Sequence, residues 1–214
     1  MKSRFALAAA AMTCLLACAA IIGIMQQKEA VNQIVDVYLG NTRLAIPSPY
    51  FRFDHAKLGG RLPEIDLAAD SKTFRPVILK VKIPKRNQKP AENTLYLTVS
   101  NASETLGPGE RTTRLYARFL EADVWSHPGG LIMRRFQDGS PNKNEDLYMA
   151  PPEGRRFSAR CPRPRQPPDG LPDSCLADIR LDGIDVRLRF SSALLPDWEQ
   201  LYNGTRGLVQ SFRR

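Results

Sequence analysis

The chain has 214 residues, of which 43% are hydrophobic and 25% are charged, so it can form one globular domain with a sizeable core in addition to a targeting segment. Its 17 prolines argue against a compact all-helical protein, because each proline lacks a backbone donor and fixes its own backbone angle. The formal net charge of +9 suits an acidic partner (nucleic acid, anionic lipid, acidic glycan or acidic protein), but it is equally typical of a basic protein that is merely soluble.

The amino-terminal segment predicts a membrane anchor. Residues 5–25 (FALAAAAMTCLLACAAIIGIM) carry no charge, and a helix of this length reaches about 31 Å, which is close to the thickness of a bilayer core. Lys2 and Arg4 favour a cytoplasmic amino terminus. We therefore expect residues 1–25 to span the bacterial inner membrane and residues 26–214 to form a single domain in the periplasm.

Two alternatives lead to the same side of the membrane. In the first, residues 17–19 (Ala-Cys-Ala) are a signal-peptide cleavage site, which would leave a soluble periplasmic protein. In the second, residues 15–18 resemble a bacterial lipobox, in which Cys18 is lipidated, although Leu16 is larger than the residue usually found there. A buried core helix is disfavoured because the segment has no polar face.

The two cysteines outside this segment, Cys161 and Cys175, predict a disulfide. They bracket a proline-rich loop, and a bridge between them would stabilise the fold by about 3 kcal/mol in the chain-entropy model. An exported compartment permits such a bond. The alternative is a pair of free thiols. A zinc site has little support because no second Cys or His pair lies nearby at ligand spacing.

Alternation of apolar and polar residues predicts strands through most of the domain. Residues 34–46 read as a hairpin that turns at Gly40-Asn41, and further strands are expected at 77–83 and 95–99. A longer strand is expected at 113–125, with a bulge near Phe119-Leu120 where the alternation changes phase. Weaker strand signals follow at 131–136 and 146–149.

The carboxyl end combines a hairpin with a helix. Residues 177–190 alternate around Asp182-Gly183, a pair that suits a type I′ turn. Pro196 then opens a helical pattern in which Trp198, Leu201, Tyr202, Leu208, Val209 and Phe212 share one face. The predicted fold class is α+β: a mainly antiparallel sheet with a carboxyl-terminal amphipathic helix.

No motif in the sequence indicates catalysis. HExxH, G-x-S-x-G, Walker A and G-x-G-x-x-G patterns are all absent from it. His55 and His127 are isolated and lie near turns. Acid pairs such as Glu64 with Asp66, or Glu121 with Asp123, would serve a glycosidase but are expected by chance among 22 acidic residues. We expect no catalytic, cofactor or metal site.

The basic segment that begins at residue 155 is more distinctive. Five arginines fall within eleven residues: Arg155, Arg156, Arg160, Arg163 and Arg165. Guanidinium groups bind carboxylates directionally, and the neighbouring prolines lower the entropy lost on binding. The cluster suits an acidic protein or anionic lipid, or it is a solvated basic loop. Nucleic acid is not an expected partner, given the compartment and the lack of interleaved aromatics apart from Phe157.

Both ends of the chain resemble a known group of proteins. The runs VYLGNTRLAIPSPYF and SCLADIRLDGIDVRLRFSSALLPDWEQLYNGTRGLVQSFRR, about 55 residues together, look like those of small exported bacterial immunity proteins encoded with secreted toxins. The resemblance implies a protein of the cell envelope that binds and blocks a toxic effector, often a lipase-type effector of a type VI secretion system. It assigns no inhibitory residue.

Three functional hypotheses follow. The first is a periplasmic immunity protein whose partner is a secreted toxic effector. The second is a structural or accessory component of an envelope secretion or pilus assembly, which the anchor and the arginines would suit equally well. The third is an envelope hydrolase, which would need a deep pocket where acids or His55 converge.

Overall fold

The computed structural model describes residues 33–77, 93–102, 106–163 and 174–214. Several predictions concern residues outside these ranges and are not tested by the structure. They are the anchor at residues 1–25 with Cys18, the domain boundary at residue 26, Arg165, and nearly all of the strand expected at 77–83. Within the described ranges, no helix is both long enough and apolar enough to cross a membrane.

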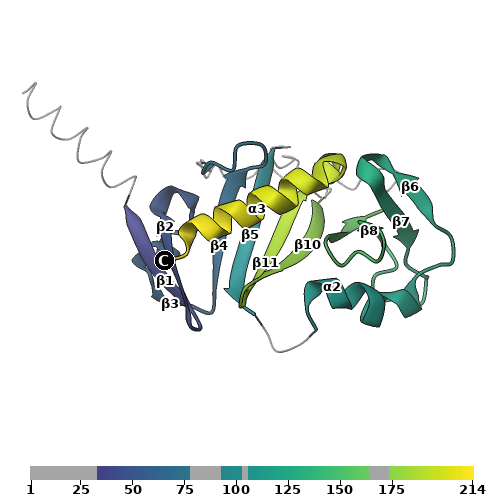
Figure 1. The fold of residues 1–214 in the computed structure, drawn as a ribbon, viewed down its shortest axis with the longest axis horizontal. Coiled ribbons are helices and arrows are strands. Elements are labelled where there is room, and N and C mark those ends of the chain that lie inside the picture. The colour runs from purple at the N-terminus through teal and green to yellow at the C-terminus, as the bar shows by residue number, and fades with distance from the viewer. Residues whose placement is uncertain (1–32, 78–92, 103–105, 164–173) are drawn as a thin grey trace, which may run out of the picture.

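A small sheet lies at one end of the molecule, beside the carboxyl terminus (Figure 1). Strand β1 (Ile34–Leu39) pairs antiparallel with β2 (Thr42–Pro47) and parallel with the short β3 (Gly60–Arg61). The alternate residues Val35, Val37 and Leu39 of β1 are buried, and this confirms the hairpin predicted at residues 34–46.

The main sheet has eight described strands in the order β4-β5-β11-β10-β9-β8-β7-β6, and every pairing in it is antiparallel. The eight strands are β4 (Glu64–Asp70), β5 (Thr94–Asn101), β6 (Trp125–His127), β7 (Leu131–Arg135), β8 (Glu145–Met149), β9 (Ser158–Pro162), β10 (Ser174–Leu181) and β11 (Ile184–Ser191). Strands β5, β7 and β8 match the predictions at 95–99, 131–136 and 146–149.

The predicted carboxyl-terminal hairpin is β10 and β11, at the centre of this sheet. Asp182 and Gly183 occupy the turn with φ angles of 41° and 89°, which is the left-handed conformation that a type I′ turn requires. Alternate residues on both strands are buried and face α3, while the residues between them form the opposite face of the sheet.

Helix α3 (Trp198–Phe212) follows a 3-10 segment, η6 (Ser192–Asp197), which contains Pro196. The Ser191 side chain accepts a hydrogen bond from the Ala193 N–H and so caps η6. The helix runs across the sheet from its β6–β8 side to the small sheet (Figure 1). The predicted stripe is buried except for the half-buried Tyr202. The predicted α+β fold is therefore confirmed.

A close approach fixes one position of α3. A Cβ atom at Gly204 would overlap the ring of Phe74, whereas nothing lies near a Cβ at Gly207. Phe74 reaches this place from the turn after β4, with a φ of 54°. Two glycines that look equivalent in the sequence therefore differ: one is required by packing and the other is not.

The region 108–119 corrects a prediction, because it is helical and not a strand with a bulge. It comprises α2 (Pro108–Arg111), the π turn η3 (Thr112–Tyr116) and the 3-10 turn η4 (Ala117–Phe119), so of the strand expected at 113–125 only Trp125 belongs to a described strand. Pro108 suits a first helical turn, where the Glu110 carboxylate accepts a bond from the Gly107 N–H.

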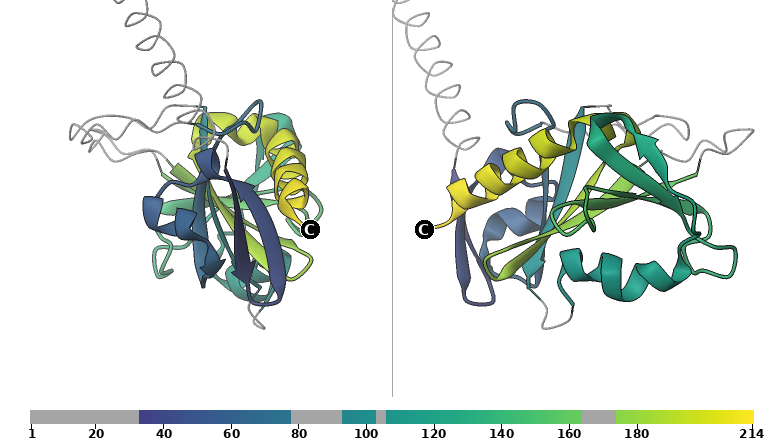
Figure 2. Two further views of the ribbon diagram at one scale, coloured as in Figure 1. Left: turned by 90° about the vertical axis from the view of Figure 1, so that its left-hand side faces the viewer. Right: turned by 45° about the vertical axis from the view of Figure 1, so that its right-hand side comes forward.

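This helical segment lies on the face of the sheet opposite α3 (Figure 2). The helical spacing of Thr112, Tyr116 and Leu120 turns these side chains inwards, and it prevails over the alternation of apolar residues that suggested a strand. A small second core forms beneath it, consisting of Leu120, Phe136, Leu147 and Met149.

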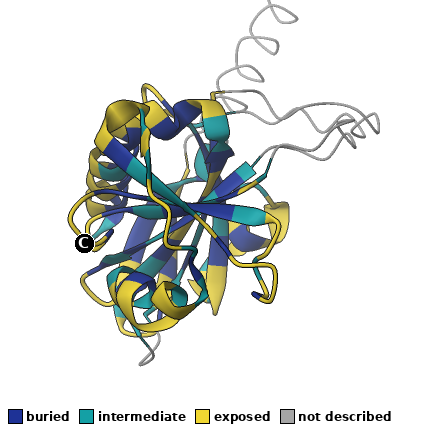
Figure 3. Ribbon diagram, turned by 90° about the vertical axis from the view of Figure 1, so that its right-hand side faces the viewer, coloured by how far each residue is buried: buried dark blue, intermediate teal, exposed yellow. Residues whose placement is uncertain are grey.

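The main core lies between α3 and the centre of the sheet and extends to the small sheet. Buried residues gather on the strands in the middle of the molecule, and exposed residues lie on the outer sides of the helices and on the turns (Figure 3). The remaining short helical turns are η1 (Ser48–Tyr50), η2 (Asp54–Leu58) and η5 (Pro128–Gly130).

Candidate functional site

Arg155 and Arg156, the first two predicted binding residues, lie in the turn before β9 and are exposed. Arg155 pairs with Glu153 at 2.8 Å. Arg156 pairs with Glu199 of α3 at 3.3 Å, and its guanidinium lies over the Trp198 ring at 5.3 Å. Both remain accessible to solvent, and Arg156 also joins the turn to the helix.

Arg160 and Arg163 are used differently, because they pair within the fold. Arg160 on β9 contacts Glu145 of β8 at 2.8 Å. Arg163 contacts Asp146 at 2.7 Å and also donates a hydrogen bond to the carbonyl of Phe136. The Asp146 side chain is only 9% exposed, so Arg163 neutralises a carboxylate that is almost removed from water.

The structure thus divides the predicted arginine cluster. Successive residues on a strand point to opposite faces, and β9 carries Arg160 away from the exposed turn that holds Arg155 and Arg156. Arg160 instead lines a small cleft under α2, together with Arg111, Tyr116 and Asp178. Both arginines of this cleft already contact carboxylates, Arg111 reaching Asp178 at 2.8 Å.

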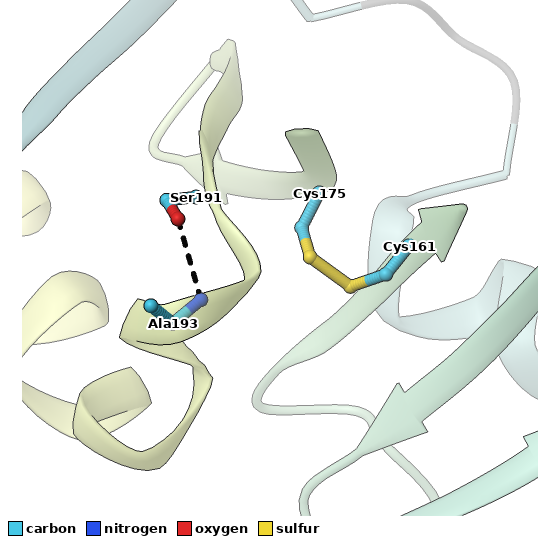
Figure 4. Close-up of a disulfide and its surroundings, with 4 residues drawn as sticks. All are labelled: Cys161, Cys175, Ser191 and Ala193. Carbon is cyan, nitrogen blue, oxygen red and sulfur yellow. Dashed lines mark hydrogen bonds between the residues drawn. A yellow bond between two sulfur atoms is a disulfide. The ribbon is translucent and has the colours of Figure 1, made fainter. Parts of the chain in front are cut away.

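The predicted disulfide joins Cys161 at the end of β9 to Cys175 at the start of β10 (Figure 4). The two strands are hydrogen-bonded neighbours, and their residues Ala159 and Ala177 are paired in register. Both cysteines are buried in the main core, so the bond fixes the point where the two strands meet.

The histidines and acids that were considered for catalysis do not converge. His55 stacks on Phe53, whereas His127 packs edge-on against Tyr148 at the other end of the sheet. Asp66 accepts a hydrogen bond of 2.6 Å from Thr98. In the described ranges no group of three or more His, Cys, Asp or Glu residues could hold a metal ion.

Several shifted pKa values trace to surface hydrogen bonds. Arg43 lowers the pKa of Asp36 by hydrogen bonding to its carboxylate, and Lys57 does the same to the pKa of Asp54. The backbone N–H of Thr73 lowers the pKa of Asp70. These groups belong to separate turns and strands, so their charges stabilise local structure.

A surface that sequence reasoning missed lies where η2 meets the edge of β4. The Arg52 guanidinium lies 5.1 Å from the centre of the Phe53 ring and 4.5 Å from that of Tyr96 on β5. His55 of η2 stacks on the ring of Phe53, which precedes η2, with the two ring centres 5.8 Å apart. Leu58 at the end of η2 is 88% exposed. We call these five residues the Arg52 surface.

The run FRFDHAKLGG, residues 51–60, carries a signal for this surface besides His55. It also alternates aromatic and basic groups, and it places Leu58 immediately before two glycines. An apolar residue next to a glycine turn is often exposed, but only the fold brings Tyr96 from another strand to complete the stack.

The molecule is thus an α+β protein in which a large antiparallel sheet carries the carboxyl-terminal helix on one face and a short helical segment on the other. No protein-family model matches the chain, and no curated protein matches it by sequence.

Two solved structures are similar to this chain, one of them with a TM-score above 0.5. One is an immunity protein of the Stenotrophomonas maltophilia type IV secretion system, with a TM-score of 0.60 and 15% sequence identity over 86% of this chain and 94% of that chain. Another is FrpD, an iron-regulated outer membrane lipoprotein of Neisseria meningitidis, with a TM-score of 0.49 and 14% identity over 85% of this chain and 93% of that chain. At such identities the likeness is one of fold.

Proposed function

We propose that this chain is an immunity protein located outside the cytoplasm, where it neutralises a secreted toxic effector by binding to it. The observation that carries the proposal is the fold shared with the Stenotrophomonas maltophilia immunity protein, which extends over 94% of that chain. The resemblance of both ends of the sequence to exported immunity proteins supports the same function independently.

The disulfide supports the compartment. Structural disulfides persist in oxidising environments such as the bacterial periplasm and are rare in the cytosol. The bond between Cys161 and Cys175 is buried and joins two neighbouring strands, which is the placement of a structural bond. Residues 1–25 would then hold the domain at the inner membrane, either as an anchor or through a lipid on Cys18.

Neutralisation by binding requires a rigid surface and no chemistry of its own. Arginine and aromatic side chains on well-held segments are the groups that dominate protein interfaces. The domain presents such groups around Arg52, and around Arg156 where it lies over Trp198. The type of secretion system is set by the effector, and our proposal of a type VI effector comes from the sequence resemblance.

A protection experiment tests the proposal. Each neighbouring gene that encodes a candidate secreted toxin is expressed in a host bacterium with an export signal, with and without the full chain. We expect one toxin to stop growth, and the chain to restore growth and to co-purify with that toxin in a fixed ratio.

The opposite outcome is equally clear. If the chain restores growth against none of the toxins and instead co-purifies with several subunits of a secretion or pilus machine, the immunity function is wrong. The protein is then an accessory component of that assembly. A version of the chain without residues 1–25 and without an export signal is the control, because it should remain in the cytoplasm and give no protection.

A further inference from the structure

We propose that the Arg52 surface is the docking site for the partner, and that the partner is a protein that presents an apolar pocket bordered by carboxylates. This inference rests on the proposed function, which it deepens by naming the surface and the chemistry of the effector.

Exposure sets this surface apart. Leu58, the last residue of the five-residue turn η2, is 88% exposed, and Phe53, which immediately precedes that turn, is 43% exposed. Leu58 is the most exposed of the large apolar side chains in the described ranges. Burial of exposed apolar groups by a partner is favourable, and single protruding side chains fit pockets.

The segment that carries these residues is held at both ends, so it would lose little conformational entropy on binding. At its start, the Arg52 N–H donates to the Asp66 carbonyl of β4 at 3.0 Å. At its end, β3 pairs with β1 and the Leu62 N–H donates to the Tyr38 carbonyl at 3.1 Å. Gly59 has a φ of 71°, and a Cβ there would lie 2.6 Å from the Asp36 carbonyl oxygen, so only glycine fits.

The charge of Arg52 is not fully satisfied within the fold. Its nearest carboxylate is Asp66 at 4.0 Å, and that carboxylate already accepts a hydrogen bond from Thr98. The Arg52 Nε is buried and has no hydrogen-bond partner among the described residues. The buried Nε is out of a partner's reach, but the Arg52 side chain is 31% exposed, so a carboxylate from a partner can pair with its terminal nitrogens.

Two further arginines extend the positive charge. Arg189 lies opposite Tyr96 in the β5–β11 pairing, is exposed, and forms no ion pair with any residue of the described ranges. Arg61 beside η2 lies over Tyr38 and, among the residues that the structure describes, donates a hydrogen bond to the Gly40 carbonyl alone, at 3.3 Å. The apolar centre therefore has a basic border, which is complementary to a pocket with an acidic rim.

The charges also favour a protein over an anionic membrane. Asp54, the first residue of η2, follows Phe53 directly, and its side chain is 95% exposed while it pairs with Lys57 at 2.7 Å. The neighbouring Glu64 of β4 is exposed as well. On a membrane these carboxylates would be repelled by the phosphates of anionic lipids, whereas a protein partner can place a hydrogen-bond donor opposite each of them.

Binding measurements on the full chain in detergent micelles test the inference, with the toxin identified by the protection experiment as the probe. The variants are Leu58→Asp with Phe53→Ser, and Arg52→Gln alone. We expect the first to weaken binding by about 100-fold and the second by about 10-fold, because central apolar and arginine side chains dominate interfaces. The affinity of the unchanged chain should also fall as salt is added.

Matched controls separate this surface from others. Gln210→Asp on the exposed side of α3 should leave the affinity unchanged, and all variants should melt at the temperature of the unchanged chain, since Leu58 and Phe53 lie outside the core. A photo-reactive amino acid at position 58 should cross-link to the toxin in cells, whereas one at position 210 should not.

Distinct results would overturn the inference. If Arg155→Ser with Arg156→Ser abolishes binding while the Leu58 variant binds normally, the partner uses the arginine turn. If the unchanged chain binds vesicles of phosphatidylglycerol or forms a dimer, and Leu58→Asp removes that property but not toxin binding, the surface serves a membrane or a second copy. Failure of the unchanged chain to protect against any toxin concerns the proposed function, not this surface.

Discussion

The two halves of the main sheet are stabilised in different ways. The half formed by β4, β5, β11 and β10 is covered by α3, and its alternating apolar residues build the large core. The half formed by β9, β8, β7 and β6 contributes fewer residues to that core, among them Leu131, Ala159 and Cys161, and it adds a second core of four buried residues in the described ranges. Arginine pairs and the disulfide supplement it, among them Arg163 with Asp146 and Arg160 with Glu145. A run of arginines in a sequence can therefore reflect the needs of the fold as much as those of a partner.

Trp198 joins the halves, and its removal should have the largest effect. The side chain packs on Phe157 with ring centres 5.3 Å apart, and its Nε1 donates to the Gly129 carbonyl at 2.9 Å. Trp198→Ala should lower the free energy of unfolding by about 3–5 kcal/mol. Urea titration followed by circular dichroism measures this, and Trp125→Ala on the edge strand, where the side chain is half-exposed, should cost clearly less. If the two substitutions lower the free energy of unfolding equally, Trp198 does not join the two halves of the sheet.

The disulfide should rank second. Replacing both Cys161 and Cys175 with alanine removes the cross-link that restricts the unfolded chain. The unfolded state then has more conformational entropy, so stability should fall by about 3 kcal/mol. The same loss should appear when the unchanged chain is titrated with urea under reducing conditions. If reduction alone leaves the urea midpoint where it was, the bond contributes nothing to the weaker half of the sheet.

The Arg163 pair tests the idea that the arginines serve the fold. Arg163→Met would leave the Asp146 carboxylate nearly buried with no partner, at a cost of about 2 kcal/mol after allowing for partial exposure. Arg155→Met should change stability by no more than about 0.5 kcal/mol, because Arg155 is exposed. Thermal unfolding of both variants gives the comparison. A double variant, Arg163→Met with Asp146→Asn, should recover part of the loss.

The smallest effects come from the half covered by α3, where packing decides. Gly207→Ala meets open space and should stabilise the helix by about 1 kcal/mol. Gly204→Ala instead forces the Phe74 ring aside and should destabilise by about 1–2 kcal/mol. Urea unfolding of the two variants side by side measures the difference, and a shared direction of change would show that the ring moves freely.

The sequence predicted the half of the fold in which local pattern and packing agree. The β10–β11 hairpin, the β1–β2 hairpin and the stripe of α3 were all visible, because each element buries one face and its turn needs particular residues. The disulfide was visible because only two cysteines lie outside the first 25 residues.

The rest depended on contacts between distant segments. The region 108–119 alternates apolar residues like a strand, but Pro108 and the packing of Tyr116 over Phe136 make it helical. The Arg52 surface needs Tyr96 from a strand that is far away in the sequence. The sequence placed the arginines of residues 155–163 together, but it could not show which carboxylates they would meet.

The central position of β11 has a consequence for biosynthesis. This strand joins β5 to β10, and it is synthesised well after β5. Until residues 184–191 emerge, the edge of β5 has no partner strand and is a template for pairing with other chains. Such distant pairing also slows folding. A newly made chain is therefore expected to need a chaperone until β11 is available, and truncation before β11 should produce aggregates instead of a shorter folded domain.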